Sequence, residues 1–151
     1  MKKAAINFTQ FMGIGFLLVV LDQVSKWISV QYFQDAWVII PYWLEFEYHE
    51  NLGVGFSIML PQLIVEIVSG LVILFGVLFL YTKRPPNTLI WAIVLVLSGA
   101  LGNLIDRIRL DYVIDFVSHG FWPVYNMADI YICLGLGIWF WTDLKNNKKS
   151  R

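Results

Sequence analysis

Aspartates are the residues in this sequence whose type and spacing could carry out a reaction. The chain has no Ser/His/Asp set, no H-E-x-x-H motif and no phosphate-binding glycine loop. Two aspartates within ~3 Å of each other cannot both ionise comfortably, so they share one proton. One carboxylate can then take a proton from water while the other donates to the carbonyl oxygen under attack. Such a pair would hydrolyse a peptide bond without a metal or a covalent intermediate.

Local charges narrow the choice of aspartates, because a nearby cation keeps a carboxylate ionised. The aspartates with a cation close by in the sequence are Asp22 near Lys26, Asp106 beside Arg107, and Asp111 near Arg107 and Arg109. Asp115 in "VIDFV" and Asp129 in "NMAD" have no cation within four residues. Asp115 and Asp129 are therefore the predicted catalytic pair.

The composition is typical of a membrane protein. Apolar residues make up 58% of the 151 residues and charged residues only 15%, whereas soluble domains carry about 25% charged residues. No basic block is interleaved with aromatic residues, so no nucleic-acid partner is expected. The one cysteine, Cys133, excludes an intrachain disulfide and is interpreted as a small packing residue. His49 and His119 are interpreted as surface or interfacial residues, and neither a metal nor a cofactor is predicted.

Four stretches are long and apolar enough to cross a bilayer, which requires about 20 helical residues. They comprise approximately residues 6–28, 63–81, 88–107 and 128–142. The first stretch lacks an A-x-A-like cleavage site and its apolar pattern continues into "DQVSKWISV", so we interpret it as a retained span. The predicted fold is an all-α membrane protein in which residues 1–151 form a single integral-membrane domain.

Basic residues predict the orientation of these spans. Eight of the eleven Lys and Arg residues fall on one side of the membrane, which should be cytoplasmic by the positive-inside rule. These are Lys2, Lys3, Lys83, Arg84, Lys145, Lys148, Lys149 and Arg151. Both termini are therefore predicted to be cytoplasmic, and segments 29–62 and 108–127 should face outward. Asp143 falls on the cytoplasmic side, which separates it from the other candidate aspartates.

The outer segments contain strand patterns. In "LEFEYHE", apolar and polar side chains alternate with the period of a half-buried strand. "DYVIDFV" is rich in β-branched and aromatic residues, and Gly120 and Pro123 indicate a turn after it. We therefore expect a small β-rich extracytoplasmic element on the outer membrane surface. Four aromatic residues could anchor it at the interface: Trp37, Trp43, Phe121 and Trp122.

Polar residues from all four spans fall in one layer near the outer face. They are Asp22, Lys26, Asn51, Glu66, Asn103, Asp106, Arg107, Asn126 and Asp129. Each could have a purely structural role, such as an i,i+4 ion pair for Asp22 and Lys26 or an N-cap for Asn126. The small residues of "SGALG" could serve only close helix packing. Convergence from separate segments nevertheless favours one functional site, because ionisable groups within a membrane are costly.

Five motifs give the chain a resemblance to the bacterial lipoprotein signal peptidases (signal peptidase II) over nearly its whole length. They are "DQVSK" (22–26), "NLGVGF" (51–56), "GNLIDR" (102–107), "VIDF" (113–116) and "YNMAD" (125–129). Their order in a four-span chain of this length makes the resemblance specific. The second motif departs from the family pattern N-x-G-A-A-F, because Val54 and Gly55 replace the two alanines.

The resemblance implies an aspartic endopeptidase of the bacterial cytoplasmic (inner) membrane. Such an enzyme removes the signal peptide of a prolipoprotein by cleaving before the diacylglyceryl-modified cysteine. The family's catalytic pair corresponds to Asp115 and Asp129, in agreement with the elimination above. Its supporting polar positions correspond to Asp22, Lys26, Asn51, Asn103, Asp106, Arg107 and Asn126. The site would lie near the outer face, because the acyl chains of the substrate remain in lipid.

Two other functions fit the same residues. Intramembrane Asp, Lys and Arg also build the pathways of small ion- or proton-coupled carriers, but here the polar residues do not continue to the cytoplasmic face. A structural membrane subunit would use them only as ion pairs between helices. The partners expected for the peptidase are the signal peptide with its diacylglyceryl-cysteine and membrane lipid, and a monomer is compatible with the sequence.

Overall fold

The computed structural model describes residues 8–53, 61–83, 85–120 and 122–149. These residues form α1 (Phe8–Tyr32), β1 (Trp37–Ile40), β2 (Leu44–Asn51), α2 (Gln62–Lys83), α3 (Asn87–Leu110), β3 (Val113–His119), β4 (Trp122–Tyr125) and α4 (Met127–Lys149). Within the described residues, four helices are long and apolar enough to cross a membrane. The predicted fold class, four transmembrane helices with a small β-rich element, is confirmed.

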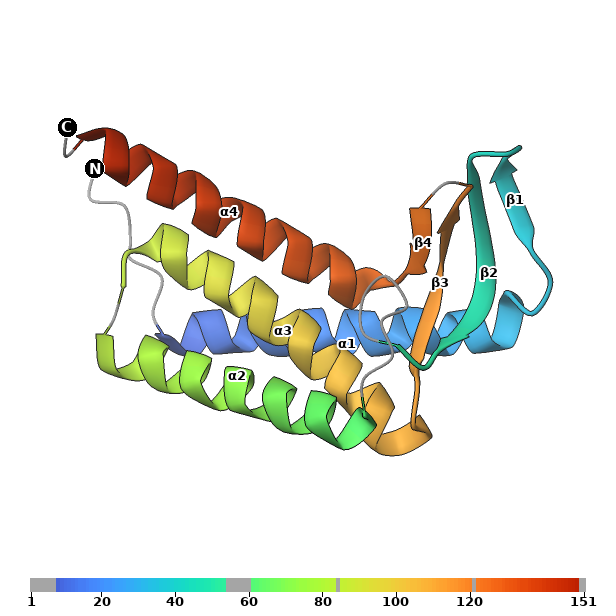
Figure 1. Cartoon of the computed structure of the whole chain (residues 1–151), viewed down its shortest axis with the longest axis horizontal. Coiled ribbons are helices and arrows are strands. Elements are labelled where there is room, and N and C mark those ends of the chain that lie inside the picture. The colour runs from blue at the N-terminus through green and yellow to red at the C-terminus, as the bar shows by residue number, and fades with distance from the viewer. Residues whose placement is uncertain (1–7, 54–60, 84, 121, 150–151) are drawn as a thin grey trace.

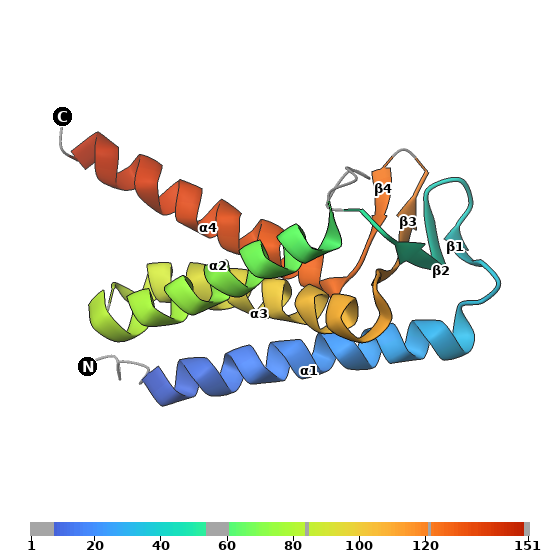
Figure 2. The same ribbon diagram turned by 60° about the horizontal axis from the view of Figure 1, so that its bottom comes forward.

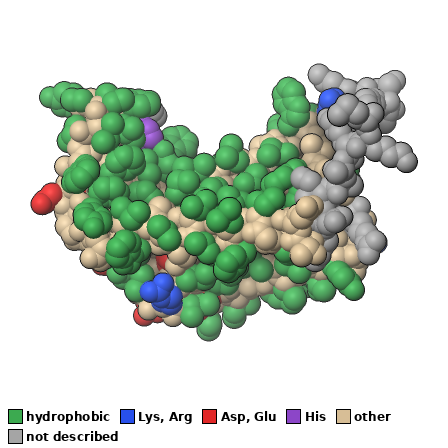
Figure 3. Space-filling view, turned by 180° about the vertical axis from the view of Figure 1, so that it is seen from behind, with side chains coloured by type: hydrophobic (Ala, Val, Ile, Leu, Met, Phe, Trp, Pro, Cys, Tyr) green, Lys and Arg blue, Asp and Glu red, His purple; other side chains and the backbone are tan. Residues whose placement is uncertain are grey.

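The four helices run side by side, and the sheet lies at one end of them (Figures 1 and 2). The helix α3 packs against each of the other three helices. Towards the end away from the sheet, Phe11, Leu80, Val94 and Leu97 form a buried apolar core. Apolar side chains also cover most of the outer surface in Figure 3. A helix that is apolar on its outer face as well as on its inner face is typical of a membrane span.

The sheet is antiparallel and has the strand order β1-β2-β3-β4. In its centre, His49 on β2 lies opposite Asp115 on β3. Ile114 and Phe116 on β3 are buried in an apolar core that they share with the end of α1. Because successive side chains of a strand point to opposite faces, Asp115 points away from that core. This alternation places one carboxyl group on the other side of the sheet.

The elements extend further than the apolar pattern of the sequence indicated. The helix α1 continues to Tyr32, α3 to Leu110 and α4 to Lys149, since hydropathy detects only the apolar part of a helix. The turn expected after this strand is confirmed at Gly120, between β3 and β4, whereas Pro123 lies within β4. An edge strand tolerates proline, since one side of its backbone has no ladder to complete. Strands at "LEFEYHE" and "VIDFV" are confirmed as β2 and β3.

Three of the four aromatic residues expected at the interface are exposed: Trp37 in β1, Trp122 in β4 and Trp43 in the turn between β1 and β2. The fourth, Phe121, lies outside the described residues, as do the two departures from the family motif at Val54 and Gly55. Exposure of large aromatic side chains fits the expected position at a membrane surface.

Candidate active site

Lys26 is the centre of a buried ionic cluster between α1 and α3. Its Nζ lies 2.9 Å from Oδ2 of Asp22 and 2.8 Å from Oδ2 of Asp106, and it donates to Oδ1 of Asn103 at 2.9 Å. All three donors of the ammonium group are thereby used, and Lys26 and both aspartates are at most 1% exposed. Among the described residues, Asp106 therefore pairs with Lys26 and not with its sequence neighbour Arg107. Local sequence indicated only Arg107 as a cation near Asp106 and did not indicate this closer ion pair with Lys26 of another helix.

The two aspartates of this cluster also bind the backbone of other elements. Oδ1 of Asp22 accepts a hydrogen bond from the N–H of Ala128 in α4 at 2.9 Å. Oδ2 of Asp106 accepts one from the N–H of Ile114 in β3 at 3.2 Å. Each of these backbone groups belongs to the residue directly before one of the two predicted catalytic aspartates. The ionic cluster thus fixes the backbone on which the predicted catalytic pair is placed.

Asn126 directly precedes α4 and forms a reciprocal cap with Asp129. The N–H of Asp129 donates to Oδ1 of Asn126 at 3.1 Å, and the N–H of Asn126 donates to Oδ2 of Asp129 at 3.2 Å. This is the geometry of a capping box, in which two orphan donors of a helix start are satisfied together. The N-cap expected for Asn126 is confirmed, and it restricts the position of the Asp129 carboxylate.

The side chain of Asn126 also connects this carboxylate with Asp115. Its Nδ2 donates to Oδ1 of Asp115 at 2.6 Å and lies 3.1 Å from Oδ1 of Asn103. The Nδ2 of Asn103 in turn donates to Oδ1 of Asp129 at 2.9 Å. Two buried asparagines therefore join both predicted catalytic carboxylates to Lys26.

Asn51, the last residue of β2, holds the other oxygen of Asp115. Its Nδ2 donates to Oδ2 of Asp115 at 2.7 Å, while its Oδ1 accepts from the N–H of Gly53 at 2.8 Å. Burial raises the pKa of Asp115 to about 6; the Asn51 donor opposes this rise, and the neighbouring Asp129 carboxylate adds to it. A carboxyl group whose pKa is raised in this way can retain a proton at a pH where an ordinary aspartate is ionised.

Asp115 and Asp129 line the same cavity, which has a volume of about 840 Å³. Polar residues that line it with them include His49, Asn51, Asn103 and Arg107, and apolar ones include Val65, Ala100 and Ile132. Cys133 lines the cavity too and is exposed. The interpretation of Cys133 as a packing residue is therefore wrong, because its side chain faces this open space instead of a neighbouring helix.

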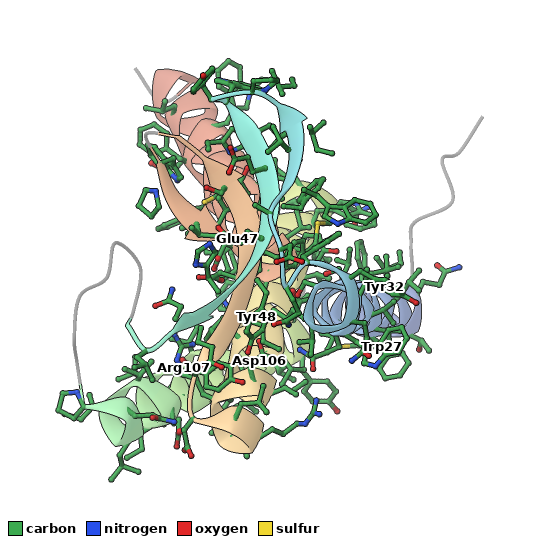
Figure 4. All side chains as sticks on the ribbon, turned by 90° about the vertical axis from the view of Figure 1, so that its right-hand side faces the viewer. Trp27, Tyr32, Glu47, Tyr48, Asp106 and Arg107 are labelled. Carbon is green, nitrogen blue, oxygen red and sulfur yellow. The ribbon has the colours of Figure 1, made fainter. Side chains whose placement is uncertain are left out.

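Arg107 lies on the cavity wall at the sheet end of α3. Its Nη2 donates to the carbonyl oxygen of Gly53 at 3.1 Å. Figure 4, seen from the sheet end, shows Asp106 and Arg107 close together on this part of α3. Arg107 thus holds the chain directly after Asn51, the residue that binds Asp115.

The structure gathers in one region the two predicted catalytic residues and the seven predicted supporting residues. Five of them line the cavity, namely Asn51, Asn103, Arg107, Asp115 and Asp129. The other four, Asp22, Lys26, Asp106 and Asn126, are buried behind its wall. Glu66, which shares the same layer in sequence, is not among the described residues that line the cavity. It accepts a hydrogen bond from Gln62 at 3.0 Å and interacts electrostatically with Arg107.

Gln23 is a site residue that the sequence reasoning missed. Its Nε2 donates to Oδ1 of Asp106 at 2.9 Å, and so completes the hydrogen bonding of that buried carboxylate. The signal was present, because Gln23 is an uncharged polar residue directly after Asp22 within an apolar span. Gly102 is a second such residue, since a Cβ atom there would clash with Oδ2 of Asp22.

Sequence and structure comparisons with known proteins agree with the resemblance found in the sequence motifs. The family model described as Signal peptidase (SPase) II matches residues 14–145. A lipoprotein signal peptidase of Moorella thermoacetica is 34% identical over 137 residues, which cover 87% of this chain and 90% of the relative. That of Caldanaerobacter subterraneus subsp. tengcongensis is 33% identical over 126 residues, covering 78% and 84%. A bacterial membrane enzyme solved by the in meso method at 2.3 Å resolution has a TM-score of 0.87 and 26% identity, covering 95% of this chain and 93% of its own.

Proposed function

The chain belongs to the signal peptidase II family, and we propose that Asp115 and Asp129 are the two catalytic carboxylates of this aspartic peptidase. The observation that carries this assignment is that Asn126 donates to both carboxylates, from Nδ2 to Asp115 and from the backbone N–H to Asp129. Both carboxylates also line one cavity. The alternative of an ion-coupled carrier is not supported, because the matched relatives are lipoprotein signal peptidases.

In the proposed reaction, a water molecule between the two carboxyl groups attacks the scissile carbonyl carbon. The ionised carboxylate removes a proton from this water, and the protonated partner donates its proton to the carbonyl oxygen. The tetrahedral intermediate then collapses: the amide nitrogen takes the proton held by the first carboxyl group, and a hydroxyl returns a proton to the second. The C–N bond breaks, and the pair again holds one shared proton.

The surroundings of the two aspartates suggest which one holds this proton at rest. Burial raises the pKa of Asp115 to about 6, which favours its protonated form. Because the pair holds a single proton, Asp129 in the first turn of α4 is then the ionised partner. In this proposal, Asp115 is the acid of the resting pair and Asp129 is the base that activates water.

The other predicted site residues act as supports in this proposal. Asn51, Asn103 and Asn126 orient the two carboxylates through the hydrogen bonds described above. Asp22, Lys26 and Asp106 hold the backbone of α4 and β3 in place. Arg107 keeps the chain after Asn51 against the cavity wall. Such support matters because fixed polar groups need no rearrangement during the reaction.

We propose further that the substrate is a prolipoprotein with a diacylglyceryl-modified cysteine, cleaved before that residue. Acyl chains stay in lipid, because each buried CH₂ contributes about 0.8 kcal/mol, and this holds the scissile bond near the headgroup level. The end of the helices opposite the sheet carries Lys83 and Lys145 (Figure 1). This distribution supports an inner-membrane enzyme with cytoplasmic termini and an outward-facing site, formed by residues 1–151 as one peptidase domain.

The catalytic pair is tested by incubating detergent-purified protein with a diacylglyceryl-modified prolipoprotein and following the loss of the signal peptide by mass. We expect Asp115→Asn and Asp129→Asn each to lower the rate by about 10³-fold, as removal of a general acid or base does. Asp143→Asn, in the same helix as Asp129 but far from the cavity, is the matched control and should retain activity. Cleavage that persists in either of the first two variants would overturn this choice of residues, provided that thermal unfolding shows all proteins to be folded.

A further inference from the structure

His49 lies beside the proposed catalytic pair but takes no part in the proton transfer described above. It is directly opposite Asp115 in the antiparallel pairing of β2 with β3, and it lines the same cavity. Side chains of directly opposite residues lie on the same face of a sheet, with Cβ atoms about 5 Å apart. The imidazole ring is therefore next to the place where the scissile bond must lie.

The orientation of this ring is fixed by Glu47, two residues earlier on the same strand. Nε2 of His49 lies 2.9 Å from Oε2 of Glu47. Because an ionised carboxylate only accepts hydrogen bonds, Nε2 carries the hydrogen, and Nδ1 of a neutral ring is then an acceptor. Among the described residues, Nδ1 has no hydrogen-bond partner. The side chain of His49 is 41% exposed and lines the cavity, so the ring is open to a substrate bound there.

Among the hydrogen bonds of the described residues, none joins His49 to the carboxyl oxygens of Asp115 and so explains its position. Those two oxygens accept their hydrogen bonds from Asn51 and Asn126. A peptide that places its carbonyl carbon at the catalytic pair presents main-chain N–H groups on either side of the scissile bond. We infer that Nδ1 of His49 accepts a hydrogen bond from one of these substrate N–H groups and so positions the peptide for cleavage. The inference rests on the proposed catalytic pair.

The first test compares the steady-state kinetics of His49→Ala and His49→Asn with those of the unchanged enzyme. Loss of one neutral hydrogen bond should raise KM by about 3- to 10-fold, while kcat changes by less than about twofold. An asparagine oxygen can take the place of Nδ1, so His49→Asn should restore part of the lost affinity. Glu47→Gln, which loosens the ring without removing it, should give a smaller rise in KM.

The matched control is His119→Ala. His119 is on the neighbouring strand β3 and is not among the described residues that line the cavity. His119 binds the hydroxyl group of Tyr125 and packs against Trp43. Its loss should therefore lower the temperature of unfolding and leave KM unchanged. If His49→Ala also lowered only this temperature, with an unchanged KM, His49 would have a structural role and the inference would fall.

A second test identifies the substrate group. Peptide bonds flanking the scissile bond are replaced one at a time by esters, which removes a single N–H group. We expect one replacement to raise KM for the unchanged enzyme and to have no further effect on His49→Ala, which is the signature of two groups in contact. Equal effects of every ester on both enzymes would overturn the inference.

The aspartate variants are measured in parallel, so that the two proposals fail separately. Inactive Asp115→Asn and Asp129→Asn together with an unchanged KM of His49→Ala overturn the role of His49 alone. Cleavage that persists in either aspartate variant overturns the catalytic pair and, with it, the role of His49.

Discussion

At the scale of single residues, asparagine is the side chain that organises the surroundings of the two carboxylates. Asn51, Asn103 and Asn126 each present Nδ2 to an aspartate. Each also uses its Oδ1 as an acceptor, for the N–H of Gly53, for Lys26 and for the N–H of Asp129 respectively. An amide that is satisfied at both ends has one favoured orientation, so the donors remain aimed at the carboxylates. An ionised aspartate in place of any of these asparagines could not donate this hydrogen bond.

The raised pKa of Asp115 leads to a prediction about pH. The proposed mechanism needs one proton on the pair, so cleavage should decline as rising pH removes it. The Asn51 donor lowers the pKa of Asp115 from the value that burial alone would set. Asn51→Ala removes this donor and raises the pKa further, so the alkaline limb of the pH profile of kcat/KM should move to higher pH.

This shift is measured from pH 5 to 9, with Asp35→Asn as the control. Asp35 is an exposed carboxylate in the connection between α1 and β1, and its loss should leave the limb in place. A limb that stays in place or moves to lower pH in Asn51→Ala would contradict the assignment.

The free energy of unfolding gives a second pH prediction. Between pH 3.8 and about 6, Asp115 holds a proton in the folded protein but loses it in the unfolded chain. The free energy of unfolding should therefore fall as pH rises through that window.

At the scale of elements, small residues on α3 bring α4 to the site. A Cβ atom on Gly99 would clash with the carbonyl oxygen of Ala128 and approach Cγ1 of Ile132 to 2.7 Å. A backbone oxygen cannot rotate away as a side chain can, so α3 and α4 approach this closely only because residue 99 is glycine. Asp129 lies in the first turn of α4 and Asn126 directly precedes this helix. The contact between α3 and α4 therefore sets the position of one member of the proposed catalytic pair.

Gly99→Ala should consequently impair both the fold and the reaction. We expect the free energy of unfolding to fall by about 1–3 kcal/mol, as for other overpacked positions, and the cleavage rate to fall by more than tenfold. The matched control is Gly137→Ala on α4, where an added Cβ meets nothing within 4 Å. Thermal unfolding in detergent and the cleavage assay check both effects. Equal activity of the two variants would contradict the role of the close contact.

At the scale of the whole molecule, charged and polar groups divide the protein into two unlike ends. The sheet end holds the cavity and the ionic cluster of Lys26. The opposite end holds the connection between α2 and α3, with Lys83 at the end of α2 (Figure 1). Between them, the helices expose apolar side chains on their outer faces. In the proposed function, this arrangement places the polar reaction at one surface of the bilayer while the apolar faces of the helices remain in lipid.

The proposed orientation is tested with single cysteines in a Cys133→Ser background. Asp35→Cys lies at the sheet end and Lys83→Cys at the opposite end. A maleimide that does not cross membranes should label Asp35→Cys in intact cells and Lys83→Cys only after the membrane is opened. The reverse labelling pattern would show that the sheet faces the cytoplasm.

Much of this protein could be predicted from the sequence because the relevant signals are local. Apolar runs predict spans, alternation predicts β2 and β3, and an ionisable residue within an apolar run indicates a site wherever it occurs. The absence of a cation near Asp115 and Asp129 in the sequence, together with the family motifs, predicted that these two residues form a pair, and both line one cavity in the structure. Their catalytic role stays a prediction.

Other features were decided by the tertiary structure alone, because they depend on contacts between residues far apart in the chain. The partner of Asp106 is Lys26 of another helix, not the adjacent Arg107, since helix packing overrides sequence proximity. Cys133 faces a cavity whose opposite wall comes from other elements. His49 stands beside Asp115 only through the register of β2 with β3, and a change of register by one residue would turn it to the other face.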